Sequence, residues 1–213
     1  MTSFLTKTFL AASLMVGGTQ FANAETKTIV LAGGCFWCVE SDFDTVKGVT
    51  KTTSGFAGGT SADPTYKNHA GHREVVKIEY DSTLTDYKTL VTTFLRTIDP
   101  TDGGGQFCDR GASYAPGLFA SNAEEKKIAE AVLAEASAEL GKKLPVPVLT
   151  TINFGAADAY HLDYYKSSEK VVTRFGIIKK ADAYKKYRAG CGRDAGVRAV
   201  WGDKAYAGVK LHS

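Results

Sequence analysis

The chain has 213 residues, of which 44% are hydrophobic and 23% are charged, a composition that argues against disordered, collagen-like and coiled-coil proteins. Its length leaves room for one domain or two small ones. The net charge is only +3, and without a block of basic residues this balance argues against a dedicated nucleic-acid-binding protein.

The N-terminal segment has the pattern of a secretory signal peptide. Residues 8–18 form an apolar run, and Ala22, Asn23 and Ala24 form the small-residue pattern that signal peptidase cleaves. The run is shorter than the roughly 20 residues that cross a bilayer, and a short buried helix, the alternative, leaves the cleavage pattern unexplained. We therefore expect residues 1–24 to be a signal peptide, residues 25–213 to form one domain, and the mature protein to be periplasmic and not inserted in the membrane.

The first half of the mature chain alternates predicted strands and helices. Apolar residues recur with a period of two in the strands and at three- to four-residue spacing in the helices. The predicted elements are a strand at 26–32 that ends in two glycines, a helix at 35–46, strands at 49–56 and 74–80, and a helix at 85–96 capped by Thr85.

The second half is less regular. A glycine-rich loop spans residues 103–115, and Ser121 with Glu124 three residues later forms a capping-box pattern for a helix that ends at Gly141. Residues 146–154 predict a strand, a tyrosine-rich helix follows from Asp158, and the tail after Tyr187 is rich in glycine and basic residues. The alternation of strands and helices predicts one α/β-type domain.

Cys35 has the strongest chemical signal in the sequence. It lies where a strand passes through two glycines into a helix, and backbone N–H groups at a helix N-terminus favour a thiolate. Cys38 follows one turn later as C-x-x-C. A zinc site is disfavoured because neither Cys108 nor Cys191 has a second ligand at zinc-binding spacing. The alternative for Cys35 is an inert buried thiol.

Motifs in consistent order make residues 27–193 resemble one family, the A-type peptide methionine sulfoxide reductases. Three departures from the family pattern are Phe56 where tyrosine is common, Asp63 for asparagine, and Cys38 where many members have glycine. The matching segments are GCFW at 34–37, GFAGG at 55–59, PTY at 64–66, GHREVV at 71–76, DRGASY at 109–114, YHLDYY at 160–165 and GCG at 190–192.

The resemblance implies a fold and an activity. The fold is an α+β two-layer sandwich with a ferredoxin-like core, a mixed sheet with flanking helices, and the catalytic cysteine at a helix N-terminus. The activity is that of a peptide-methionine (S)-S-oxide reductase, which reduces peptide-bound or free methionine S-sulfoxide and so repairs oxidised proteins. Residues 25–213 are then one catalytic domain.

The resemblance also assigns roles. Cys35 is the nucleophile that becomes a sulfenic acid, and Glu74 is the acid that protonates the departing oxygen, provided that burial raises its pKa. Phe36 and Trp37 hold the S-methyl group. The residues expected around the sulfoxide oxygen are Tyr66, Tyr114 and Asp109.

The sequence leaves three candidates for the cysteine that resolves the sulfenic acid. Cys191 could swing over the site from a glycine-rich segment, Cys38 is always close to Cys35, and Cys108 adjoins the site residue Asp109. A static Cys108–Cys191 bridge would leave Cys35 and Cys38 as the redox pair.

Two other functions compete with this assignment. One is a C-x-x-C thiol-disulfide oxidoreductase, and the other is a secreted binding domain with two static disulfides. For the reductase, we expect no bound cofactor or metal, a thioredoxin-like electron donor, oxidised proteins or peptides as substrates, and a monomer that binds no nucleic acid.

Overall fold

The computed structural model describes residues 25–150 and 153–212, so the segment expected to be a signal peptide lies outside the described residues. A six-stranded sheet has the order β7-β6-β1-β3-β2-β8. Its neighbours pair antiparallel except β6 and β7, which are parallel. The strands are β1 (Thr26–Ala32), β2 (Val49–Ala57), β3 (Arg73–Asp81), β6 (Gly117–Ala120), β7 (Val148–Thr150) and β8 (Gly155–Ala156).

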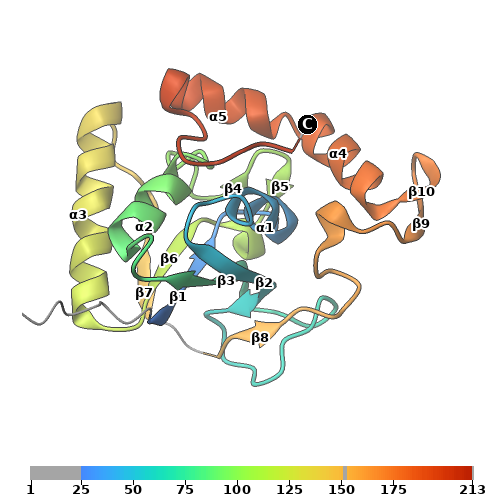
Figure 1. Cartoon of the computed structure of the whole chain (residues 1–213), viewed down its shortest axis with the longest axis horizontal. Coiled ribbons are helices and arrows are strands. Elements are labelled where there is room, and N and C mark those ends of the chain that lie inside the picture. Colours follow the sequence, from blue (N-terminus) through green and yellow to red (C-terminus); the bar gives the residue numbers. More distant parts are fainter. Residues whose placement is uncertain (1–24, 151–152, 213) are drawn as a thin grey trace, which may run out of the picture.

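Helices cover one face of this sheet (Figure 1). The central order β6-β1-β3-β2, with one helix between β1 and β2 and another between β3 and β6, is the ferredoxin-like arrangement. The expected mixed sheet with flanking helices is confirmed. Within the described residues the helices are α1 (Phe36–Phe43), α2 (Tyr87–Leu95), α3 (Ala123–Leu140), α4 (Lys180–Gly190) and α5 (Arg193–Trp201).

The core lies between the sheet and the helices. Leu31 and Ile78 from the strands are fully buried against Phe43 of α1 and Phe94 of α2. A smaller apolar cluster on the opposite sheet face includes Phe119. This unequal division agrees with a two-layer architecture, in which one sheet face packs on helices.

The predicted caps of α2 and α3 are each displaced by one residue. Asp86, not Thr85, caps α2, and its carboxylate accepts a hydrogen bond from Thr89 N at 2.7 Å. Asn122, not Ser121, caps α3 by accepting from Glu125 N at 2.9 Å. The Glu125 carboxylate accepts in turn from Ser121 N at 2.7 Å, so the capping box exists one residue later because asparagine performs the same role as serine.

The C-terminal third differs most from the sequence predictions. Of the strand expected at 146–154, the structure has β7 at Val148–Thr150, and β8 lies beyond that range at Gly155–Ala156. The helix expected from Asp158 is a series of turns and the 3₁₀ helix Tyr164–Lys166. Asp163 has a left-handed φ of 54° that interrupts helical geometry. The tail instead contains α4, α5 and a hairpin of β9 (Lys170–Thr173) and β10 (Gly176–Lys179). No helix among the described residues is long and apolar enough to cross a membrane.

A glycine at the end of β1 sets the entry to α1. Gly34 has a φ of 81°, and a Cβ there would lie 2.6 Å from Gln106 Cβ. We expect Gly34→Ala to lower the free energy of unfolding by about 2–4 kcal/mol, because left-handed strain and overpacking act together. Urea denaturation provides the measurement.

Gly141→Ala is the matched control for that substitution. Gly141 also has a left-handed φ, 62°, but a Cβ added there would meet no neighbouring atom of the described chain within 4 Å. Gly141→Ala should lower the free energy of unfolding by only about 1 kcal/mol. Equal losses for the two variants would show that close packing at Gly34 contributes nothing.

Candidate active site

Cys35 occupies the N-cap position of α1, as the sequence predicted. Its carbonyl accepts hydrogen bonds from Cys38 N at 3.1 Å and Val39 N at 3.4 Å, which begin the helix. Cys35 is partly exposed, whereas Cys38, one turn later, is buried. Both are free thiols, so the attacking position is open to a substrate and its neighbour is shielded.

The two thiols form one hydrogen-bonded pair with the negative charge on Cys38. The hydrogen bond to Cys38, followed by burial, raises the pKa of Cys35 well above its usual value. The same hydrogen bond, assisted by Arg193 and Arg188, lowers the pKa of Cys38 to about 7 despite burial. The hydrogen bond and burial therefore oppose the ionisation of Cys35 that its position at the helix N-terminus favours, whereas the neighbouring cations favour charge on Cys38.

The two arginines come from the C-terminal helices and are themselves buried. Arg193 is 1% exposed and donates to Gly33 O at 3.1 Å and Thr97 O at 3.0 Å. Arg188 forms an ion pair with buried Asp42 at 2.8 Å and donates to the Tyr184 hydroxyl at 2.8 Å. They fix α4 and α5 beside the thiol pair and supply its positive charge.

Glu74 lies on β3 below the start of α1 and is 2% exposed. Its Oε2 accepts a hydrogen bond from Phe36 N at 3.0 Å. Burial raises the pKa of Glu74 to about 8, with a further contribution from Asp109. The carboxyl group therefore carries a proton at neutral pH beside the residue that follows Cys35.

A chain of polar groups connects Glu74 to the surface. Tyr114 hydrogen-bonds to Glu74, and Tyr66 hydrogen-bonds to Tyr114. Burial raises the pKa of both tyrosines, so both remain protonated donors. Asp109 is half-buried nearby, and burial raises its pKa. The structure thus brings these sequence-predicted residues into one cluster with Cys35.

The two aromatic residues after Cys35 have different surroundings. Trp37 lines the pocket at Cys35 and stacks on Tyr164 with a centroid distance of 3.9 Å. His161 also stacks on Trp37, with centroids 5.6 Å apart. Phe36 is 1% exposed and packs on Phe56 at 5.7 Å. The apolar wall facing the pocket is therefore Trp37, which Phe36 supports from the core.

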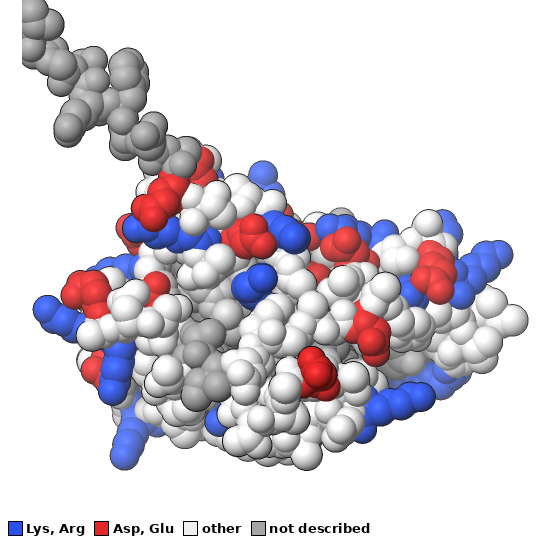
Figure 2. Space-filling model, turned by 90° about the horizontal axis from the view of Figure 1, so that it is seen from below, with Lys and Arg blue, Asp and Glu red and all other residues white. Residues whose placement is uncertain are grey.

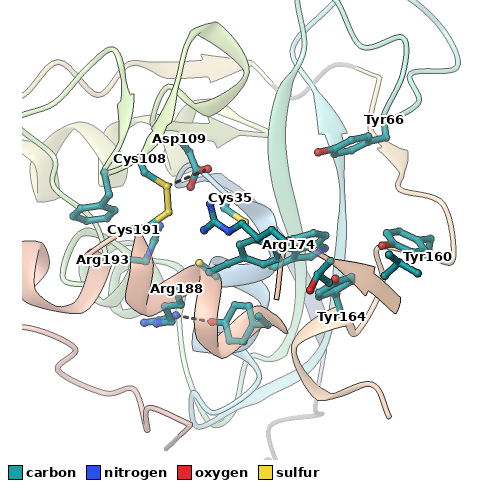
Figure 3. Close-up of a pocket in the computed structure, with 17 residues that line it drawn as sticks. Cys35, Tyr66, Cys108, Asp109, Tyr160, Tyr164, Arg174, Arg188, Cys191 and Arg193 are labelled. Carbon is teal, nitrogen blue, oxygen red and sulfur yellow. Dashed lines mark hydrogen bonds between the residues drawn. A yellow bond between two sulfur atoms is a disulfide. The ribbon is translucent and has the colours of Figure 1, made fainter. Parts of the chain in front are cut away.

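All four cysteines line one pocket of about 390 Å³ (Figure 3). Cys108 and Cys191, 83 residues apart, form a disulfide that joins the active-site loop to the end of α4. Among the arrangements left open by the sequence, the structure has the Cys108–Cys191 bridge with Cys35 and Cys38 as thiols. In the described part of the chain, the group of residues close enough to share a metal ion is Cys108, Asp109 and Cys191, and its two sulfurs are bonded to each other.

Comparisons with known proteins agree with this geometry. Residues 27–191 match the family model described as peptide methionine sulfoxide reductase. A relative from Rhizobium meliloti (strain 1021), peptide methionine sulfoxide reductase MsrA 2, is 47% identical over 188 residues, which cover 87% of this chain and 89% of the relative. The chain belongs to the peptide methionine sulfoxide reductase family. Another relative of the same name, from Caulobacter vibrioides, is 41% identical over 91% of this chain and 96% of its own.

Solved structures show the same fold. Reduced Mxr1 from Saccharomyces cerevisiae has a TM-score of 0.62 and 26% identity, covering 78% of this chain and 99% of its own. Methionine sulfoxide reductase A of Corynebacterium diphtheriae has a TM-score of 0.58 and 26% identity, covering 71% and 82%. This chain is accordingly a thiol-dependent methionine sulfoxide reductase, an oxidoreductase of the EC 1.8.4.11 type.

Sequence reasoning missed several residues of this reductase site. Arg188 and Arg193 lie in a tail whose helices the sequence did not predict, and Arg174 lies on an unpredicted hairpin. Tyr160 and Tyr164 belong to a family-like motif that gave them no role. Only the motif gave a usable signal, because Arg188 and Arg193 reach Cys38 through tertiary packing from 150 and 155 residues away.

The Cys108–Cys191 disulfide should stabilise the reductase. Closing a loop of 83 residues restricts the unfolded chain, so we expect Cys191→Ser to lower the free energy of unfolding by about 2–4 kcal/mol. Urea denaturation under non-reducing conditions gives the value. Addition of a reductant should abolish the difference between wild type and variant; a difference that persists would mean that lost packing, not the disulfide, is responsible.

Proposed function

We propose that this reductase repairs methionine S-sulfoxide in exported polypeptides, with Cys35 as nucleophile and Glu74 as general acid. The observation that carries the proposal is the buried, protonated Glu74, held 3.0 Å from Phe36 N directly beside Cys35. A carboxylic acid that keeps its proton near neutral pH can donate it to a leaving oxygen. Tyr66 and Tyr114 supply further donors for that oxygen, and Asp109 orients them.

The first step forms a sulfenic acid. The Cys38 thiolate takes the proton of the Cys35 thiol, and the Cys35 sulfur attacks the sulfoxide sulfur. Glu74 transfers its proton to the sulfoxide oxygen, which passes as hydroxyl to Cys35, and methionine leaves. Cys35 is oxidised and methionine is produced by reduction. Trp37 packs against the S-methyl group, with Phe36 behind it.

We propose Cys38 as the resolving cysteine. Its sulfur attacks the Cys35 sulfenic acid, forming a disulfide, and its proton leaves with the hydroxyl as water. The hydrogen bond between the two thiols supports this choice. Cys191 and Cys108 are engaged with each other, so either could resolve Cys35 only after their own bond opens.

A thioredoxin-like protein is the proposed electron donor, which returns the Cys35–Cys38 disulfide to thiols by exchange. No bound cofactor takes part in this scheme. The alanine-rich cleavage pattern at residues 22–24 supports removal of residues 1–24 as a signal peptide. The proposed mature form is one catalytic domain of residues 25–213, a periplasmic monomer whose donor must also lie outside the cytoplasm.

The experiment that tests the function is a single turnover without reductant. Reduced enzyme is mixed with an equal mixture of S- and R-sulfoxides of N-acetyl-methionine amide, and the products are resolved by chiral chromatography. We expect about one methionine derivative per chain, taken from the S form alone, and a Cys35–Cys38 disulfide on peptide mapping. Consumption of the R form, or no change at Cys35, would contradict the proposal.

The same reduced enzyme also tests the competing function, that of a general thiol-disulfide oxidoreductase. A general thiol-disulfide oxidoreductase with the Cys35–Cys38 pair would reduce oxidised glutathione readily and leave the sulfoxide untouched. The reductase should show the opposite selectivity, because the protonated Glu74 has a role only when an oxygen must leave.

A further inference from the structure

The pocket at Cys35 extends well beyond the thiols. Besides Cys35 and Trp37, it is lined by Val172, Thr173 and Arg174 of the β9–β10 hairpin. Its volume of about 390 Å³ is in the range of pockets that enclose whole ligands. The methyl sulfoxide group needs only the Cys35 end, so the hairpin end is available to the rest of the substrate.

The hairpin turn holds Arg174 in place. Thr173 pairs with Gly176, which leaves Arg174 and Phe175 as a two-residue turn. The Thr173 hydroxyl donates to Gly176 O at 3.0 Å and accepts from Phe175 N at 3.0 Å. The Arg174 guanidinium lies 4.8 Å from the Phe175 ring and 5.2 Å from the Tyr187 ring. Two aromatic faces therefore orient its charge.

Arg174 has no carboxylate partner among residues 25–150 and 153–212. Arg188 forms ion pairs with Asp42 and Asp194, but none of the ion pairs of the described chain includes Arg174. The pocket lining contains three arginines and one carboxylate, Asp109. A guanidinium that is exposed and fixed by stacking is suited to binding a carboxylate from outside the protein.

The same hairpin exposes apolar side chains. Val172 is 85% exposed and Ile177 is 70% exposed, and the two are directly paired across the strands. Val172 also lines the pocket. At the end of the molecule where Figure 1 places the hairpin, Figure 2 shows uncharged surface with lysine and arginine side chains, and also acidic ones, beside it. Apolar surface bordered by cations is complementary to a polypeptide with apolar and acidic residues.

We propose that the β9–β10 hairpin docks the polypeptide that carries the methionine sulfoxide, with Arg174 binding an acidic side chain beside the oxidised residue. Val172 contacts an apolar neighbour on the same segment. Continuity of the hairpin with the Cys35 pocket makes it the second half of the substrate site (Figure 3). This inference rests on the proposed function and adds a sequence preference to it.

The test compares three capped peptides that differ only in the residue after methionine S-sulfoxide: aspartate, alanine or lysine. Dithiothreitol serves as reductant, so that docking of a protein donor plays no part. We expect wild type to prefer the aspartate peptide over the alanine peptide in kcat/KM by about fivefold, the scale of a partly exposed ion pair. Arg174→Ala should remove this preference and leave the alanine peptide within about twofold of its wild-type rate.

Two further variants test whether the peptide preference depends on Arg174 itself or only on positive charge near the pocket. Arg174→Lys keeps the positive charge and should retain part of the preference. Lys186→Ala is the matched control: Lys186 lies 5.5 Å from the Phe175 ring and is exposed, but it does not line the pocket. It should leave the peptide preference unchanged. Equal effects of Arg174→Ala on all three peptides would overturn the proposal.

The remaining outcomes of the test also support or overturn the docking proposal. N-acetyl-methionine S-sulfoxide amide has no carboxylate, so Arg174→Ala should change its turnover no more than it changes turnover of the alanine peptide. If the variant slows only free methionine sulfoxide, Arg174 binds the α-carboxylate and the polypeptide proposal fails. If Val172→Ser or Arg174→Ala acts only when thioredoxin replaces dithiothreitol, the hairpin belongs to the donor, again overturning it. Failure of wild type to reduce any of these sulfoxides would instead refute the underlying function.

Discussion

Replacing Glu74 with glutamine is expected to lower kcat/KM for methionine S-sulfoxide by about 10²- to 10⁴-fold, the usual contribution of a positioned general acid. Glutamine preserves the shape and can still accept the hydrogen bond from Phe36 N, which is 3.0 Å from the carboxylate. It cannot donate an acidic proton. The loss should therefore appear in the chemical step, measured as methionine release in a single turnover.

The pH profile provides a second readout. Because burial raises the pKa of Glu74 to about 8, the acid is present below that pH and wild-type activity should fall above it. The pKa of Cys38, about 7, predicts a rise in activity as the thiolate forms. The activity of wild type should therefore follow a narrow bell-shaped pH profile between the pKa values of Cys38 and Glu74. Glu74→Gln should lose the alkaline limb, and an unchanged alkaline limb would exclude Glu74 as the acid.

The free energy of unfolding should also depend on the protonation of Glu74. The folded pKa of Glu74 is above its ordinary value of 4.5, so between these values the folded protein binds a proton that the unfolded chain releases. Folding stability therefore decreases as the pH rises through this window, and Glu74→Gln should be less sensitive to pH there. Glu79→Gln is the control on the same strand, because Glu79 is only partly buried and contacts Lys51 at 3.8 Å; it should affect neither activity nor this pH dependence.

Replacing Cys38 with serine should separate the first turnover from recycling. Serine cannot form the disulfide, so steady-state turnover with a thioredoxin donor is expected to fall by about 100-fold, since a positioned intramolecular thiol is replaced by a thiol from solution. Methionine should still be released about once per chain, but more slowly than in wild type, because serine cannot supply the thiolate that takes the Cys35 proton. Rapid quenching and chromatography measure the burst, and a thioredoxin-coupled assay measures the steady state.

Cys191→Ser is the control for Cys38→Ser. If Cys38 resolves the sulfenic acid, Cys191→Ser should keep more than half of wild-type turnover despite its lower stability. The reverse pattern, with normal recycling in Cys38→Ser and loss in Cys191→Ser, would identify Cys191 as the resolving residue and the observed Cys108–Cys191 bridge as one state of the cycle.

The sequence predicted the secondary structure correctly where the local residue pattern agrees with the final fold. The strands at β1, β2 and β3 follow β-branched and alternating residues, and Gly141 ends α3 with a left-handed φ of 62° as glycine allows. The helix predicted from Asp158 to Tyr165 is wrong because the tyrosines are spaced like a helix face, but Tyr164 stacks on Trp37 and His161 stacks on Tyr66 instead. Ring stacking with distant residues is not encoded in local periodicity.

The sequence by itself determined the family, the order of strands and helices around Cys35, and the motif residues of the site, because these depend on motifs and on short-range spacing. Only the tertiary structure decided which thiol carries the charge and which cysteines are paired. Those outcomes depend on Arg188 and Arg193, which folding brings from the C-terminal helices to Cys38. They also depend on a contact between Cys108 and Cys191 across 83 residues. Charge and disulfide pairing follow distances in space, which the spacing along the chain does not specify.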